Sequence, residues 1–466
     1  MESAAESIVK PRVYLETYGC QMNIADSELV TGVLRAAGYS KAESPEVADV
    51  ILLNTCAIRD HAEERVLKRL SVLAQFKSRR PEVRLGLLGC MAQHNRARLV
   101  EQAPYLDLVA GPDTYRRLPE LIGAARFDPV IDIRLDRDET YADLPADREG
   151  GVRAYVTAMR GCDKFCTFCV VPYVRGRERS VPAAALIREI REIAQRGVRE
   201  VVLLGQTVNA YRDGAVDFGK LLWMVAAIDG IERIRFTSPH PGDMSDSVIE
   251  AMATEPKVQP HLHLPVQSGS DRVLAAMVRG YGSGEYLDLV ARLRAAIPDL
   301  ALSTDIIVGF HGEEDADFQA TLELMKGIRY DSAFTFKYSR RENTRASITV
   351  PSTPGGTRRL VSRTSPAFSP KIARSSFSSG ESCVSPFGVI LPTRISPGRT
   401  SAPIRMIPLV SRSLSASSPT FGMSRVISSG PSLVSRAMHS NSSICTEVNR
   451  SSLTTRSEIR IESSKL

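Results

Sequence analysis

The sequence predicts an α/β protein in two parts, an open parallel sheet followed by a partial barrel, and then a tail of different composition. Short apolar runs typical of strands alternate with helical patterns, first over residues 11–126 and again over residues 151–340. Strands that alternate with helices favour parallel sheets with helices on their faces. With 466 residues, the chain is long enough for two or three domains.

The first part contains four strand-like runs, and three of them lead directly into a cysteine, namely Cys20, Cys56 and Cys90. Functional groups gather at the carboxyl ends of parallel strands, so we expect these cysteines to meet there. A free cysteine often only packs in a core. Here Gly or Asn-Thr precedes each one, and small neighbours favour a bound inorganic cluster. The predicted strands are Arg12–Tyr18, Ala48–Asn54, Arg84–Leu88 and Leu106–Ala110, with helices over Ser27–Ala37 and Ala62–Phe76.

Residues 127–150 are charged and lack periodicity, which predicts a linker. Six further strand-like runs follow, too few for a closed eight-stranded barrel, so an incomplete barrel of six β/α units is expected. The clearest helix is predicted over Pro182–Arg196, with apolar residues on one face and Gly197 past its end. The predicted strands are Arg153–Met159, Glu200–Gly205, Arg233–Ser238, His261–Val266, Leu302–Gly309 and Ala333–Tyr338.

Cys162, Cys166 and Cys169 form a C-x3-C-x2-C pattern directly after the first of these strands. Three clustered thiolates can hold three irons of a four-iron cluster and leave the fourth iron open to a small molecule. A zinc site usually has four ligands, and no further Cys or His follows before His240. Free core thiols and a disulfide are the alternatives, but the spacing favours an iron–sulfur cluster at the mouth of the barrel, where barrel chemistry resides.

Composition favours a cytoplasmic protein without a membrane anchor. The N-terminus is polar, and the longest apolar run is far shorter than the ~20 residues of a membrane span. Eight cysteines in such a chain indicate metal or redox ligands rather than disulfides. The net charge of +7 comes from residues 341–466, which hold 17 basic and 5 acidic residues. Nucleic-acid binding by the mildly acidic body therefore needs local basic patches.

Residues 341–466 also contain 31 Ser and no Asp, and 15 of their 17 basic residues are Arg. A disordered Ser/Arg/Pro tail is one interpretation. An arginine-rich arm that folds on RNA is a second. The abrupt change in composition favours a third, translation out of frame.

The cysteine loop after the first barrel strand resembles the radical S-adenosylmethionine (SAM) superfamily. Upstream, T-Y-G-C-Q-M-N at 17–23, D-S-E at 26–28, N-T-C at 54–56 and G-C-M-A-Q at 89–93 resemble the methylthiotransferases. The first of these motifs and residues 160–180 resemble the branch that acts on isopentenylated tRNA. The resemblance covers about residues 12–340 and includes strand-end segments at 203–211, 237–241, 263–270 and 304–310.

This resemblance implies two 4Fe-4S clusters and SAM as cofactors. Cys162, Cys166 and Cys169 would hold the catalytic cluster that binds SAM, and the three distant cysteines would hold a second cluster that supplies sulfur. Cleavage of SAM would give a 5′-deoxyadenosyl radical that removes hydrogen from C2 of N6-isopentenyladenosine beside the tRNA anticodon. A second SAM would supply the methyl group of the methylthio product. An electron donor and a sulfur source are also implied, and we expect a monomer.

Two further groups of residues are candidates for binding. SAM contacts are expected at Phe168, Gln206, Gln267 and Ser268, with ordinary loop chemistry as the alternative. Contacts to RNA phosphates are expected at Arg175, Arg177 and Arg179, with a solvated charged loop as the alternative.

Rival functions stay open at this point. One is a methylthiotransferase for ribosomal protein S12 or for threonylcarbamoyladenosine in tRNA. Another is an Fe–S or zinc module that binds RNA without catalysis. A third is an inactive product of a shifted reading frame, because the family continues past the barrel with a helical stretch and a small all-β RNA-binding module that nothing after Ser339 resembles.

Overall fold

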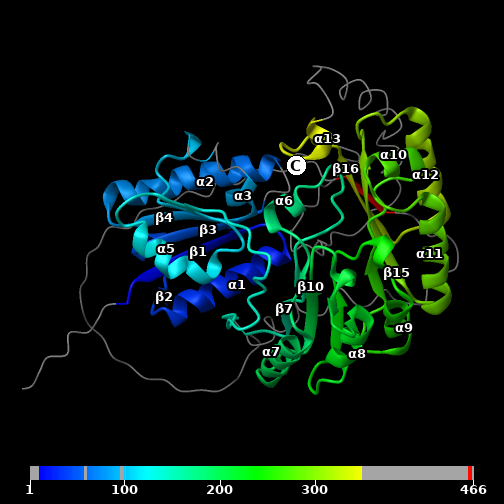
Figure 1. Ribbon diagram of the computed structural model, residues 1–466, viewed down its shortest axis with the longest axis horizontal. Helices are drawn as coiled ribbons and strands as arrows, with labels where there is room; N and C mark the ends of the chain where they lie inside the picture. Colours follow the sequence, from blue (N-terminus) through cyan, green and yellow to red (C-terminus); the bar gives the residue numbers. More distant parts are fainter. Residues whose placement is uncertain are drawn as a thin grey trace, which may run out of the picture. The chain divides into compact units, whose positions relative to one another are not determined.

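The structure is a computed structural model that describes residues 10–56, 60–94, 99, 101–148, 150–348 and 460–463. Its first part is a six-stranded sheet in the order β2-β1-β3-β4-β5-β6, and every pair of neighbouring strands is parallel (Figure 1). The strands are β1 (Arg12–Tyr18), β2 (Ser40–Lys41), β3 (Val50–Thr55), β4 (Arg84–Gly89), β5 (Leu108–Ala110) and β6 (Val130–Asp132).

Helices cover both faces of this sheet, because alternate strand residues point to opposite sides. In β3, Leu52 packs in the apolar cluster with α1 and α5, whereas Ile51 and Leu53 pack in the cluster with α2. A doubly covered parallel sheet explains why its strands are continuously apolar. The helices are α1 (Gln21–Ala36), α2 (Asp60–Arg79), α3 (Cys90–His94) and α5 (Leu118–Ala124), with short 3-10 turns at Pro45–Val47 and Tyr115–Arg117.

Residues 127–150, expected to be a linker, contribute the edge strand β6 to this sheet. Three residues are too few to display an alternating pattern, so the sequence gives no sign of this strand. Further along the segment, Tyr141 is buried and stacks on Tyr115 at a ring separation of 5.9 Å. The segment therefore packs against the sheet as well as connecting it to the barrel.

Within the described residues, the second part is an incomplete barrel of seven parallel strands: the six β/α strands that the sequence predicts, and β17 (Arg460–Ser463), which lies in the predicted tail. The strands pair as β13-β10-β7 and as β14-β15-β16-β17, and a parallel bridge between Ile234 and Val258 connects β13 to the segment before β14. The strands are β7 (Arg153–Thr157), β10 (Glu200–Leu204), β13 (Arg233–Phe236), β14 (His261–His263), β15 (Ala301–Val308), β16 (Ser332–Lys337) and β17 (Arg460–Ser463). Short pairs are β8 (Met159–Arg160) with β9 (Arg179–Ser180) and β11 (Arg212–Asp213) with β12 (Val216–Asp217).

The barrel helices pack their apolar faces on the strands. In α7, the predicted face of Leu186, Ile187, Ile190 and Ile193 is buried, and the chain turns at Gly197 with φ of +99°. The helices are α6 (Val171–Arg175), α7 (Ala183–Gln195), α8 (Phe218–Ala226), α9 (Asp246–Thr254), α10 (Asp271–Ala276), α11 (Ser283–Ala296), α12 (Asp315–Ile328) and α13 (Arg345–Ile348), with 3-10 turns at Val208–Ala210 and Pro241–Asp243.

Barrel packing continues beyond residue 340, the predicted end of this part. Thr344 and Ala346 are buried, and Ala346 packs in one cluster with Phe168 and Phe310. Most of the predicted tail, residues 349–459 and 464–466, lies outside the described residues. All the residues that the structure describes belong to one compact unit. No helix among these described residues is long and apolar enough to cross a membrane.

Candidate functional site

The loop that carries Cys162, Cys166 and Cys169 runs from β8 to α6 at the carboxyl end of β7. Gly161 allows the loop to fold back, since a Cβ there would lie 1.9 Å from the Arg177 carbonyl oxygen and its φ is +79°. The Cys162 amide donates to the Gly176 carbonyl at 3.1 Å, and its sulfur lies 3.1 Å from Thr207 Oγ1. The two ends of the loop are thus fixed to each other and to the loop after β10.

Burial opposes the ionisation of two of these thiols, Cys162 and Cys169. Burial and the neighbouring Cys166 raise the pKa of Cys169 to about 12. Burial likewise raises the pKa of Cys162. A permanent positive charge does contact one sulfur, because the buried Arg279 donates from Nη1 to the Cys166 sulfur at 3.3 Å. Thiolates here need further positive charge, which iron ions supply.

Cys20, Cys56 and Cys90 come together at the carboxyl edge of the N-terminal sheet. Cys20 follows β1 and caps α1, Cys56 follows β3, and Cys90 begins α3. A hydrogen bond with Cys56 lowers the pKa of the Cys20 thiol to about 6. Burial raises the pKa of Cys90, and the charge of Cys20 adds to that rise. Thiols that are 36 and 34 positions apart in the sequence are therefore neighbours in the fold.

The glycines beside these cysteines have a different role from the one expected. A Cβ on Gly19 would lie 2.8 Å from the Cys56 Cβ, and one on Gly89 would lie 2.5 Å from the Thr55 carbonyl oxygen. Both glycines have positive φ, which a side chain rarely tolerates. They therefore let adjacent strand ends approach each other, and in this way bring the thiols together.

A buried carboxylate, Asp26 of α1, connects the two cysteine sets. It is fully buried, and its oxygens accept from Arg160 at 2.9 Å and from Arg175 at 2.8 Å. Burial favours the neutral acid, but the two guanidiniums outweigh it and lower the pKa of Asp26. Arg160 lies two positions before Cys162, and Arg175 Nε donates to the Cys90 sulfur at 3.2 Å. Sequence reasoning missed this role, although a charged residue on the buried face of α1 was a detectable signal.

The three arginines expected to contact RNA differ in exposure. The side chains of Arg175 and Arg179 are each 5% exposed, and Arg179 pairs with Asp113 at 2.8 Å. Buried and paired guanidiniums cannot also reach the phosphates of an RNA. Arg177 is 62% exposed in its pair with Asp163, so it alone keeps the expected role.

The expected SAM contacts also separate into two groups. Gln206 accepts from the Gly161 amide at 2.6 Å, and the fully buried Ser268 contacts Thr321 Oγ1 at 3.2 Å, so both polar groups hold loops in place. Gln267 differs, because its Oε1 is buried without a partner among the described residues. Phe168 is half-buried and lies edge-on to Phe310 at 6.5 Å. Gln267 and Phe168 remain candidates to contact a ligand.

One further polar group at the barrel mouth was not predicted. His240, after β13, accepts from the Gly242 amide at Nδ1, and its Nε2 is buried without a partner in the described part of the chain. Burial and the nearby Arg279 and Lys164 lower the pKa of His240 to about 2. The ring is therefore neutral and carries its proton on Nε2, as a donor available to a ligand.

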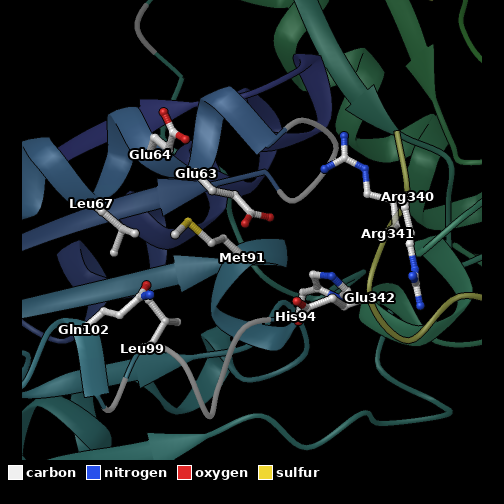
Figure 2. Close-up of a pocket in the computed structure, with 10 residues that line it drawn as sticks. All are labelled: Glu63, Glu64, Leu67, Met91, His94, Leu99, Gln102, Arg340, Arg341 and Glu342. Atoms are coloured by element: carbon white, nitrogen blue, oxygen red, sulfur yellow. The ribbon is translucent and has the colours of Figure 1, made fainter. Parts of the chain in front are cut away.

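A cavity of about 400 Å³ is lined in part by Met91, the residue that follows Cys90 in the sequence. Figure 2 shows Glu63 from α2 on one side of it and Arg340 and Arg341 on the other. Its walls carry charges of both signs, which suits a polar ligand better than an apolar one. The lining residues are Glu63, Glu64, Leu67, Met91, His94, Leu99, Gln102, Arg340, Arg341 and Glu342.

Each cysteine set offers three thiols, the number of protein ligands that leaves one iron of a four-iron cluster open. Within the described ranges, no three Cys, His, Asp or Glu side chains are placed to hold one ion. In a cubic cluster each cysteine binds a different iron, so the sulfurs need not converge on one point. Each set also has a buried arginine that donates to one sulfur, which suits an anionic group.

Comparison with solved structures identifies the same fold. The chain is similar to the radical S-adenosylmethionine methyltransferase TsrM from Kitasatospora setae, with a TM-score of 0.57 and 12% identity. The match covers 74% of this chain and 80% of that one. At this identity the likeness supports the arrangement of sheet and barrel alone.

Sequence comparison gives a more specific result. Residues 12–111 match Uncharacterized protein family UPF0004, and residues 156–325 match the Radical SAM superfamily, which implies SAM and a 4Fe-4S cluster. A tRNA-2-methylthio-N(6)-dimethylallyladenosine synthase of Cereibacter sphaeroides is 48% identical over 72% of this chain and 78% of its own length. One of Porphyromonas gingivalis is 48% identical over 74% and 76%. The chain therefore belongs to the tRNA-2-methylthio-N(6)-dimethylallyladenosine synthase family.

Proposed function

We propose that this chain is a radical SAM methylthiotransferase that adds a methylthio group to C2 of N6-isopentenyladenosine in tRNA. The observation that carries the proposal is the presence of two cysteine sets, each at least half-buried, that are connected through one buried carboxylate, Asp26. Replacing an aromatic C–H by C–S requires both a hydrogen-removing centre and a sulfur donor. Two adjacent metal centres meet that requirement, whereas one centre alone does not.

Each cysteine set has a separate task in this proposal. The barrel set would hold the 4Fe-4S cluster that binds SAM, and the sheet set would hold a second 4Fe-4S cluster that carries sulfur. When bound, these groups and SAM supply the radical, the sulfur and the methyl group. The chain itself orients them: Gln206 fixes the loop at Gly161, and Arg279 and Arg175 donate to one sulfur of each set.

Two residues of the barrel mouth would contact SAM. The Oε1 of Gln267 is an unpaired acceptor among the described residues, and it suits a hydroxyl donor such as those of a ribose. The half-buried ring of Phe168 offers an apolar surface for a flat base. Gln206 and Ser268 would act indirectly, by keeping these loops in place.

The RNA would approach the exposed side of the cysteine loop. Arg177 is the exposed cation there, and phosphate contacts from such groups add affinity for any RNA sequence. A target base in a single-stranded loop can be turned outward at a cost of a few kcal/mol. The charged cavity lined by Met91, Glu63 and Arg341 would receive polar groups of the RNA.

The proposal is tested with the full chain reconstituted with iron and sulfide, then supplied with SAM, a reductant and isopentenylated tRNA. We expect mass spectrometry of the digested nucleosides to show the 2-methylthio adduct of N6-isopentenyladenosine. Two loaded clusters without this adduct would exclude the proposed reaction for this chain. Parallel reactions with ribosomal protein S12 and with tRNA that carries threonylcarbamoyladenosine test the two rival substrates, and an adduct on either would reassign the enzyme.

A further inference from the structure

Arg175 extends from the barrel into the cysteine set of the N-terminal sheet. Its Nε lies 3.2 Å from the Cys90 sulfur, and its Nη2 lies 2.8 Å from Asp26 Oδ2. The helix that carries Arg175 also covers Cys90, which packs in one apolar cluster with Val170 and Val174. One of the three sheet cysteines is therefore in direct contact with a residue that the sheet itself does not supply.

The third nitrogen of this guanidinium, Nη1, also points to a bound group. Arg175 is 4% exposed, and its Nη1 is buried without a hydrogen-bond partner within the part of the chain that the structure describes. A buried donor without an acceptor is costly, and native proteins rarely leave one. An anionic group bound beside this guanidinium would satisfy the donor. Cluster sulfides and thiolates are acceptors of this kind.

We propose that Arg175 is a positioning residue for the cluster held by the sheet cysteines, and that it raises the reduction potential of that cluster. This inference rests on the proposed second cluster. The Nε–H bond to the Cys90 sulfur and the nearby positive charge both stabilise the more negative, reduced form. Hydrogen bonds to cluster sulfurs and net charge are the levers by which a protein sets such potentials.

Arg279 has the corresponding position at the barrel set, because it donates from Nη1 to the Cys166 sulfur at 3.3 Å. The two arginines differ in origin. Arg279 belongs to the same barrel as the cysteines that it serves, whereas Arg175 comes from the other part of the chain. The sheet cluster therefore depends on contact with the barrel for this cation, whereas Arg279 reaches the Cys166 sulfur from within the barrel.

Arg179 provides a matched control four residues away. It is equally buried and pairs with Asp113 of the N-terminal part at 2.8 Å. Its Nη2 also donates to the Arg175 carbonyl at 2.7 Å, and no hydrogen bond from it to a cysteine occurs in the described ranges. A loss of domain contact affects both arginines alike, whereas a contact to the cluster belongs to Arg175.

The experiment uses the full chain with Cys162, Cys166 and Cys169 replaced by Ala, so that only the sheet set can load iron. Arg175→Gln and Arg179→Gln are made in this background, reconstituted with iron and sulfide, and titrated with a reductant under EPR detection. We expect equal iron content and a tenfold smaller equilibrium constant for reduction in Arg175→Gln, a fall of about 59 mV. Arg179→Gln should keep the parent potential.

Other results of this titration also decide whether Arg175 acts on the cluster. Equal potentials in the parent and both variants, or equal shifts or equal iron losses in both variants, would overturn the role of Arg175. Iron loss in Arg175→Gln alone supports the direct contact. If Arg175→Gln does not fold, Arg175→Lys keeps the charge beside Asp26 and should show a smaller fall in the same direction, and an unchanged potential would overturn the inference. If the triple-Ala parent loads no cluster, the second cluster of the proposed function fails, and the inference fails with it.

Discussion

The barrel cysteines and the sheet cysteines reach their sites by different routes. Cys162, Cys166 and Cys169 lie on one loop, so their short separations in the sequence keep them close in space. The sheet cysteines come from the ends of three strands, and they meet because β1, β3 and β4 are parallel neighbours. A loop site depends on local backbone contacts, while a strand-end site depends on the register of a whole sheet and, through Arg175, on a second part of the chain.

The largest effects are expected when one cysteine of each set is replaced, because the two sets act in different steps of the proposed reaction. Cys162→Ala removes a ligand of the barrel cluster, so SAM cleavage should fall to the uncatalysed background. Cys56→Ala leaves that cluster intact, so cleavage should continue while methylthio transfer is lost. Chromatography of 5′-deoxyadenosine and mass spectrometry of nucleosides measure the two steps. Sulfur insertion at the parent rate in Cys56→Ala would remove the sheet set from the reaction.

The connection between the two sets can be broken at Asp26. Asp26→Asn leaves two buried guanidiniums without their charge partner, and we expect the free energy of unfolding to fall by about 3–5 kcal/mol. Asp246→Asn is the control, because its pair with Arg292 is on the surface and its side chain is 90% exposed. Loss of that pair should cost about 0–1 kcal/mol. Denaturant titrations of the two variants should differ accordingly, and equal midpoints would contradict the importance of the buried network.

The loop site alone should be sensitive to Gly161. In Gly161→Ala the new Cβ would collide with the Arg177 carbonyl oxygen, and φ is positive, so we expect a loss of about 1–3 kcal/mol. Iron bound by the barrel set should fall, while iron bound by the sheet set should not. Gly284→Ala is the control, since nothing lies within 4 Å of its Cβ in α11. That helix substitution should raise stability by about 0.5–1 kcal/mol.

The smallest effect is expected at Arg177, on the exposed side of the cysteine loop. Arg177→Gln should change the free energy of unfolding by less than about 0.5 kcal/mol. In binding assays, the slope of log affinity against log salt for tRNA should fall by about 1, as for one lost phosphate contact. Arg191→Gln, exposed on α7, should leave the slope unchanged. Equal slopes for both variants would leave this loop without a role in RNA binding.

Much of the architecture was predictable because apolar runs and their spacing are local properties. The prediction for β1 matches the strand at both ends, and the buried face of α7 was correct. The strand predicted at His261–Val266 ends at His263, and the chain bulges by one residue before Gln267, which pairs with Ile306 and has φ of +77°. Pro265 lies inside this run and cannot donate to a ladder, so the sequence did carry a signal for the break.

The electrostatic part of the site was less predictable. Arg175, Arg177 and Arg179 alternate with other residues in the sequence and look equivalent. Only the fold separates the exposed arginine from the two that are buried against Asp26 and Asp113. The partners of Asp26 are 134 and 149 positions away, and periodicity carries no information over such separations.

The separation of Asp26 from its partners has a consequence during synthesis. The sheet precedes the barrel along the chain, and Arg175 leaves the ribosome roughly 7–30 s after Asp26 at ordinary rates of translation. Until then, the carboxylate lacks one of its two guanidinium partners and the edge that holds Cys90 is uncovered. Iron delivered to the nascent sheet would find its cysteines open, and arrival of the barrel would then close them.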